Sequence, residues 1–371
     1  MPAGSGTGPG TASEEWTEQR PVDLGAIERE LEAQLDVLGR AGQGVVPTRA
    51  RMSNLVVFAS GEAADGRLHE SLAEISERHP SRILLLVRDD DLGAEPKAWV
   101  SALCRAGDGG RKICSEQVSI RAGGEGVRLL PSIVRPLLVG DLPTALWWAV
   151  PTPPPLAGEV FAELAAMARR ILWDSRDWAD EAVGLRSVGR WAEAVDPRIG
   201  LADLAWVRLA PWRLAVARAL GAEAAATTSV RVVHGPHALP KALLLVGWLA
   251  ARLGWRRRDG GAITPSSARW TLDGPSGRDV RVEVLRATDG PPLLLEAGFE
   301  VAGSVSRVVS VRSEPDGRLR IDPPLPGAEV LPSPSGGPGD LVARELPDLD
   351  GDPQFRAALA VARSLSEDVV G

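Results

Sequence analysis

The feature that most constrains the fold is a series of short apolar runs in the first 150 residues, separated by segments with helical periodicity. Two of the runs, residues 54–59 (NLVVFA) and 82–87 (RILLLV), are apolar almost throughout and indicate buried strands. Strands of this kind are typical of parallel sheets that are covered by helices. Two further strands are predicted at residues 113–120 and 144–150.

The segments around these runs indicate helices. Apolar residues recur every three or four positions from Leu24 to Leu38, which predicts one amphipathic helix. Further helices are predicted at residues 68–75, 98–105 and 129–139. The alternation of strands and helices predicts an α/β fold. Its N-terminal domain should have an open mixed or parallel sheet with helices on both faces.

The second half of the chain has a different pattern. Four prolines within residues 151–155 mark the sharpest internal break. From residue 268 the hydrophobic period changes to two, which indicates an antiparallel meander and hence an α+β C-terminal domain. Between these points, strands are predicted at 170–173 and 229–233. Helices are predicted at 157–169, 211–220 and 239–253, and further helical segments follow the first strand as far as about residue 194.

These patterns divide the chain into five segments, and no internal repeat is evident. The predicted division is a disordered leader (1–20), an N-terminal α/β domain (21–157), a C-terminal α+β domain (158–322), a Pro/Gly linker (323–340) and a tail with a short helix (341–371).

Composition excludes several classes of protein. Two cysteines and four histidines in 371 residues argue against a disulfide framework and a structural zinc site. The net charge of −7 argues against nucleic acid as the main partner. The N-terminus lacks the features of a signal peptide, and no apolar run is long enough to span a membrane. We therefore expect a soluble cytoplasmic protein, in which Cys104 and Cys114 are reduced thiols or, alternatively, a redox switch.

Candidate catalytic motifs are incomplete. The loop 61–66 has the glycine spacing of a phosphate-binding loop but lacks the Lys and Ser/Thr that should follow it. The glycines at 107–110 lie in the wrong context for a dinucleotide site, and Asp89–Asp91 are typical of a solvated turn. His234 and His237 lack a third metal ligand. We therefore expect no catalytic activity, no cofactor and no metal.

Tryptophan, by contrast, falls in a distinctive arrangement. The chain has twelve Trp, no Tyr and only three Lys, a bias that a GC-rich genome explains in number but not in position. Seven of the Trp residues lie in four clusters, of which two combine Trp with Arg and Asp and one pairs Trp with Arg alone. These clusters indicate either core packing with Arg stacked on indole, or a partner surface or anion pocket. The resulting partner-binding or scaffold candidates are Trp147, Trp148, Asp174, Ser175, Arg176, Trp206, Arg208, Trp212 and Arg213.

The same clusters carry a family resemblance. In chain order, the motifs are NLVVFA, HPSRILLL, ICSEQVSI, PLLVGDLPTALWW, ILWDSRDW, DLAWVRLAPWR and LLLVGWLAARLGW. Together they resemble the OpcA family, the glucose-6-phosphate dehydrogenase assembly proteins of actinobacteria and cyanobacteria. The likeness runs from about residue 51 to 258 and more weakly to about 312. It does not extend to the leader or to the region after 323, and only Cys114 lies in a family-like motif, which argues against thiol control.

The resemblance implies a function. It predicts a non-catalytic assembly factor and allosteric activator of glucose-6-phosphate dehydrogenase in the oxidative pentose phosphate pathway. A sugar phosphate is a candidate effector of such a protein. The alternative is a protein or enzyme that binds a sugar phosphate or a nucleotide, with Arg176, Arg208 and Arg213 on the phosphate and Trp212 stacked on the ligand.

Overall fold

The structure is a computed structural model of the chain, and it forms two compact units. The first unit combines Met1–Val150, Ala157–Leu172 and Gly337–Asp350; the second combines Pro151–Leu156, Trp173–Gly336 and Gly351–Gly371. Most of the predicted leader, residues 62–65 of the loop 61–66, the glycines at 107–110 and part of the predicted linker lie outside the described residues. The described residues are 17–41, 48–49, 51–61, 66–106, 112–176, 178–258, 261–264, 266–275, 277–303, 305–324, 330–332 and 336–369.

The first unit contains a mixed sheet in the strand order β1-β5-β6-β4-β3-β7-β8. The strands β6, β4, β3 and β7 run parallel to one another, β5 is antiparallel to β6 and β1, and the short β2 pairs parallel with β6. This confirms the predicted fold class. The strands are β1 (Arg20–Pro21), β2 (Thr48–Arg49), β3 (Ser53–Ser60), β4 (Ser81–Arg88), β5 (Lys97–Ala106), β6 (Lys112–Ala122), β7 (Thr144–Trp148) and β8 (Arg170–Trp173).

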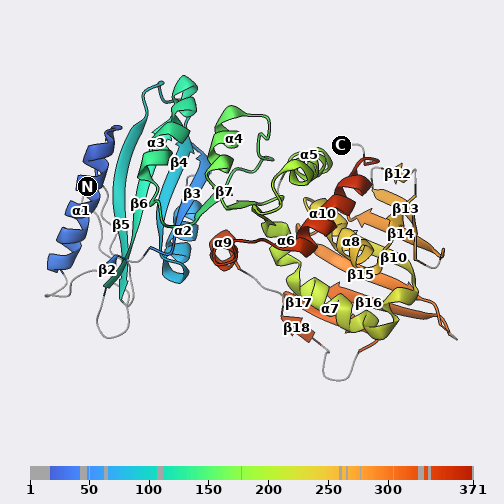
Figure 1. The fold of residues 1–371 in the computed structure, drawn as a ribbon. Helices are drawn as coiled ribbons and strands as arrows, with labels where there is room; N and C mark the ends of the chain where they lie inside the picture. The colour runs from blue at the N-terminus through green and yellow to red at the C-terminus, as the bar shows by residue number, and fades with distance from the viewer. Residues whose placement is uncertain are drawn as a thin grey trace. The chain divides into compact units, whose positions relative to one another are not determined.

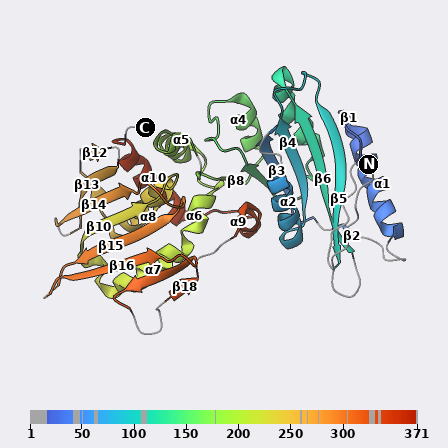
Figure 2. The ribbon, with the colours of Figure 1, turned by 180° about the vertical axis from the view of Figure 1, so that it is seen from behind.

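Helices lie on both faces of this sheet, with α2 and α3 on opposite sides (Figures 1 and 2). Because both faces are covered, β3 and β4 are buried almost from end to end, as their apolar sequences predict. The helices of the first unit are α1 (Leu24–Ala41), α2 (Gly66–Arg78), α3 (Leu130–Leu137), α4 (Glu159–Ala166) and α9 (Pro338–Glu345), and a 3₁₀ helix spans Gly124–Leu129.

One predicted helix is wrong. Residues 98–105 lie in strand β5, which pairs with β6 from Lys97 to Ala106. Its alanines and leucine are compatible with a helix, but intrinsic propensity differs by less than about 1 kcal/mol per residue among such side chains. A full antiparallel ladder, which buries Trp99 and Val100, therefore decides the conformation.

The prediction of two reduced thiols is also wrong for Cys114, which is disulfide-bonded. The Cα partner of Cys114 in the β5–β6 ladder is Cys104, the other cysteine of the chain. Directly opposite residues of antiparallel strands have Cα atoms about 4.5–5.5 Å apart, which is within reach of a disulfide. The sequence does not reveal this proximity once the segment around Cys104 is taken as a helix.

The second unit contains a sheet in the order β11-β13-β14-β10-β15-β16-β17-β18, with β12 paired to β13. The predicted meander is present as two antiparallel groups, but β10 lies between them and runs parallel to β14. A parallel neighbour needs a long crossover, and that crossover includes α8 (Leu239–Leu253). The strands are β10 (Thr227–His234), β11 (Arg256–Arg257), β12 (Ala262–Thr264), β13 (Ser267–Asp273), β14 (Asp279–Arg286), β15 (Leu294–Val301), β16 (Arg307–Ser313), β17 (Arg318–Asp322) and β18 (Val330–Pro332).

The helices of the second unit gather on one face of this sheet (Figures 1 and 2). Strands β13 and β14 accordingly alternate between buried and more exposed residues. Helix α10 contacts both α5 and α8, and its Phe355, Leu359 and Leu365 are buried. Besides α8, the second unit contains α5 (Glu181–Ala194), α6 (Leu204–Arg208), α7 (Ala210–Leu220), α10 (Pro353–Ser366), the strand β9 (Gly200–Asp203) and a 3₁₀ helix at Gly221–Ala226.

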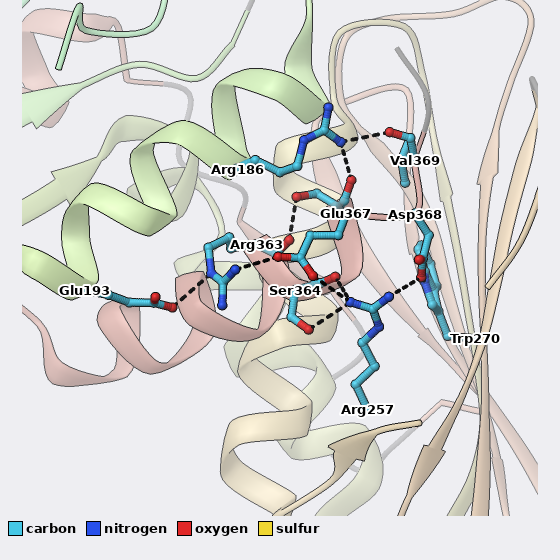
Figure 3. Close-up of polar contacts among 10 residues, drawn as sticks. Arg186, Glu193, Arg257, Trp270, Arg363, Ser364, Glu367, Asp368 and Val369 are labelled. Atoms are coloured by element: carbon cyan, nitrogen blue, oxygen red, sulfur yellow. Dashed lines mark hydrogen bonds and ion pairs between the residues drawn. The ribbon is translucent and has the colours of Figure 1, made fainter. Parts of the chain in front are cut away.

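The C-terminal end of α10 is held by polar contacts from neighbouring elements (Figure 3). Arg257 donates hydrogen bonds to the carbonyl oxygen of Ser364, to Glu367 and to Asp368, and Trp270 Nε1 also donates to Asp368 at 3.0 Å. A cation at this position suits the negative end of the helix dipole. The bond to Ser364 gives a carbonyl oxygen of the last turn a second donor, besides the backbone N–H of Glu367.

Replacing Arg257 by alanine is expected to lower the free energy of unfolding by about 2 kcal/mol, since several charge-assisted hydrogen bonds are lost from a largely buried side chain. Urea unfolding followed by tryptophan fluorescence measures this loss. The matched control is Arg269→Ala, which removes an ion pair between exposed side chains and should change stability by under about 1 kcal/mol. Equal losses for the two variants would contradict the assignment.

No helix in the described ranges is long and apolar enough to cross a membrane.

Candidate functional site

Four of the nine predicted residues meet in one charged cluster of the second unit. Asp174, Ser175 and Arg176 directly follow β8, and Arg208 is the last residue of α6. A fifth residue, Asp203, ends β9 and caps α6, since its Oδ1 accepts the backbone N–H of Ala205 at 2.8 Å. Two short strands and a helix cap therefore deliver both carboxylates to one place.

Asp174 is the anionic centre of this charged cluster. Arg208 binds it in bidentate fashion, with both N–O distances at 2.8 Å, and Arg176 lies 3.8 Å away. Burial acts to raise the pKa of Asp174, but the charge and hydrogen bonds of Arg208, together with Arg176, outweigh it and lower the pKa. Asp174 is therefore a carboxylate at neutral pH, in the geometry that Arg favours.

The pKa of Asp203 is shifted in the opposite direction, although Asp203 lies close to Asp174. It is fully buried, and its Oδ1 accepts the backbone N–H groups of Ser175 and Ala205 at 3.1 and 2.8 Å. Burial, and then the negative charge of Asp174, raise the pKa of Asp203 to about 6. The two carboxyl groups thus separate into one that stays ionised and one that takes up a proton just below neutral pH.

Lys241 of α8 completes the charged cluster. Its side chain is buried, and Nζ donates to the carbonyl oxygen of Pro292 at 3.1 Å. Burial, and then the positive charge of Arg208, lower the pKa of Lys241 to about 8. Buried lysines are rare, and this chain has only three lysines in all. That scarcity is the one sequence signal that could have singled out Lys241, which the sequence analysis missed.

Trp206 and Arg213 form a second contact of the same unit. The guanidinium of Arg213 lies 3.5 Å from the centre of the Trp206 ring, and Trp206 Nε1 donates to Asp352 at 2.8 Å. Trp206 and Trp212 are 4% and 5% exposed. The two indoles therefore lie in the core, while Arg213, stacked on Trp206, is half-buried.

Trp147 and Trp148 belong to the other unit. They end β7, and both are buried. Trp148 stacks on Phe58 with ring centres 4.3 Å apart and meets Phe161 edge-on at 5.5 Å. These two residues pack the core of the first unit and do not join the charged cluster.

The two histidines considered as metal ligands, His234 and His237, lie in different environments. His234 is buried at the end of β10, whereas His237 is exposed with a backbone φ of 54°. Among the described residues, no group of three or more His, Cys, Asp or Glu is placed to hold a metal ion. The charged cluster instead offers paired arginines, a buried acid and a buried amine.

Two domain models of one protein family, OpcA, match this chain. The OpcA-family model described as the glucose-6-phosphate dehydrogenase subunit N-terminal domain matches residues 72–190, and the corresponding C-terminal domain matches residues 199–359. The C-terminal match includes the first half of α10, beyond the region where the sequence likeness was recognised.

Curated relatives carry the same family name. The OxPP cycle protein OpcA of Nostoc punctiforme is 33% identical over 192 residues, which cover 49% of this chain and 40% of that protein. The OpcA of Synechococcus elongatus is 29% identical over 234 residues, covering 60% of this chain and 51% of that protein. The matched part of the chain thus spans about half, or less than half, of the length of these curated relatives.

Solved structures show a more distant likeness. A 3-ketoreductase from Actinomadura kijaniata, KijD10, is 13% identical with a TM-score of 0.48, over 86% of this chain and 97% of that one. GenD2 from gentamicin A biosynthesis is 17% identical with a TM-score of 0.46, over 88% and 96%. Likeness of this extent supports no inference about this chain.

Proposed function

The chain belongs to the OpcA family, which is tied by name to glucose-6-phosphate dehydrogenase assembly, and from this premise we propose a non-catalytic assembly factor and allosteric activator of that dehydrogenase. It acts in the cytoplasm, in the oxidative pentose phosphate pathway. The observation that carries the proposal is the family match across both units. An activator of this kind must bind the active state of the enzyme more tightly than the inactive state.

The test is a titration of the pure protein into the cognate dehydrogenase while NADPH formation is followed. We expect a saturable rise in rate or a fall in KM, together with a change in the size of the dehydrogenase oligomer. No change in rate, in KM or in oligomer size would contradict the proposed function.

We propose that the docking surface lies over α6 and α7. Arg is enriched among interface hot spots, and α7 presents Arg213 beside Leu214, an apolar side chain that is 47% exposed. Arg176, whose side chain is 34% exposed, adds positive charge from the charged cluster. In this proposal Trp206 and Trp212 are the rigid scaffold behind the surface, because their rings are buried.

A charged residue in place of Leu214 should weaken docking without unfolding the chain. With Leu214→Glu we expect at least a tenfold rise in the concentration needed for half-maximal activation, since a central hot spot contributes about 2 kcal/mol or more. The matched control is Val308→Glu, on the sheet of the same unit and 68% exposed, which should activate normally. Normal activation by Leu214→Glu would refute the docking surface while leaving the proposed function intact.

The alternative pocket for a sugar phosphate or nucleotide has less support. It requires Arg208 to be available for phosphate, but Arg208 is engaged in both N–O contacts with Asp174. It also requires Trp212 to stack on a ligand, but that ring is buried. No specific observation favours it at this place.

A further inference from the structure

A cavity of about 210 Å³ lies at the carboxyl ends of β10 and β14 in the second unit. These two strands run parallel, and their last residues, His234 and Arg286, are partners in the ladder. The first residues of α5 and α8, Glu181 and Leu239, complete the opposite wall. In α/β sheets, ligands bind outside the carboxyl ends of parallel strands, so the position itself is typical of a binding site.

His234 places an unpartnered acceptor in this cavity. The side chain is only 3% exposed, and its Nδ1 lies 2.7 Å from the carbonyl oxygen of Gly235. A carbonyl oxygen accepts but never donates, so Nδ1 must carry the proton. Burial lowers the pKa of His234, and the charge of Arg286 lowers it further against the effect of the Gly235 bond. The ring is thus neutral, and its Nε2 is an acceptor without a hydrogen-bond partner among the described residues.

Arg286 supplies the charge. Its side chain is exposed at the cavity, and it makes no ion pair with any carboxylate in the described part of the chain. The two carboxylates of the wall are tied to helix starts: Asp180 accepts the N–H of Val183 at 2.9 Å, and Glu181 accepts that of Leu239 at 3.0 Å. The positive ends of α5 and α8 offset those negative charges.

We propose that this cavity binds a small anion that also carries a hydroxyl group. The oxyanion group lies on the guanidinium of Arg286, and the hydroxyl donates to Nε2 of His234. A phosphorylated polyol and a hydroxy carboxylic acid share this chemistry, and both suit a cavity of this size. The inference does not rest on the proposed function, because it concerns binding by this chain alone.

The test measures binding to the pure protein, without the dehydrogenase, by calorimetric titration and thermal unfolding. The four probes are glycerol 3-phosphate, glycerate, glycerol and inorganic phosphate. We expect saturable binding of glycerol 3-phosphate or of glycerate, and the stronger of the two identifies the anionic group. Glycerol and phosphate should bind at least about tenfold more weakly, since glycerol has no charge for Arg286 and phosphate has no hydroxyl group separate from its anionic centre. No saturable binding of either hydroxylated anion, or equally tight binding of phosphate, would overturn the proposal.

Two variants locate the site. His234→Asn keeps a side-chain amide that can donate to Gly235 but removes Nε2, and Arg286→Leu removes the charge from an exposed side chain. Each should weaken binding by about tenfold. The matched control is Arg278→Leu, an exposed arginine just before the opposite end of β14 and outside the cavity, which should bind normally. Wild-type binding by Arg286→Leu would overturn the proposal even if His234→Asn failed to fold.

Discussion

Replacing Gly247 by alanine is expected to destabilise the second unit by about 3 kcal/mol or more. Gly247 lies in α8 against α10, and a Cβ atom there would be under 3.0 Å from the carbonyl oxygen of Ala358 and 3.2 Å from the amide nitrogen of Ala362. Both are backbone atoms, so no side chain can turn aside, and overpacked sites cost about 1–3 kcal/mol or occasionally more. The gain in helix propensity, about 1 kcal/mol, does not offset this.

Urea unfolding of the Gly247→Ala variant measures the effect. The matched control is Gly298→Ala in β15 of the same unit, where the nearest atom to a new Cβ is the carbonyl oxygen of Arg231 at 4.0 Å. That control should be as stable as the wild type or slightly more so, since glycine weakens a strand interior. An unchanged midpoint for Gly247→Ala would show that α10 is not seated on α8 as described.

Replacing Asp203 by asparagine is expected to stabilise the protein above pH 6 and to have little effect near pH 4. In the folded state the pKa of Asp203 is raised from its ordinary value of 3.8 to about 6. The folded protein therefore favours the protonated acid. The stability contributed by that proton is complete below about pH 4 and is lost as the pH rises through about 6. A shift of this size corresponds to about 3 kcal/mol.

Asparagine keeps an oxygen to accept the N–H groups of Ser175 and Ala205 but has no charge to bury. The measurement is the difference in unfolding free energy between variant and wild type from pH 4 to pH 8. The opposing control is Asp174→Asn, which should destabilise near neutral pH, because it leaves the cation of Arg208 without its carboxylate. A difference for Asp203→Asn that does not change with pH would refute the raised pKa.

Strands that are buried on both faces were predictable from the sequence. The runs that became β3 and β4 are apolar nearly throughout, and both their existence and their parallel arrangement follow from that pattern. The segment 98–105 was not predictable, because its composition suits either a helix or a strand and the decision rests on β6. The insertion of β10 into the meander also rests on tertiary pairing that no local pattern encodes.

The site was predictable in its residue types but not in its grouping. The Trp clusters allowed two interpretations, packed indoles with ion pairs or a partner surface. The contact of Arg213 with Trp206 and that of Arg208 with Asp174 are of the first kind. Burial is a property of the folded chain, so the raised pKa of Asp203 and the buried amine of Lys241 have no sequence pattern of their own. Trp147 and Trp148 were grouped with the other Trp residues because the sequence does not show that their strand, β7, belongs to the first unit.

Helices α9 and α10 are consecutive in the chain, yet α9 belongs to the first unit and α10 to the second. Residue Gly339 of α9 lies against the backbone of Ser71 in α2, and Gly247 of α8 lies against that of Ala358 in α10. A ribosome makes the chain from its N-terminus, and domains made in sequence usually fold one after the other. Here each unit needs a helix that is synthesised after residue 337. Neither unit can therefore complete its core before that point of translation, and the faces of α2, α5 and α8 that these helices contact stay uncovered until then.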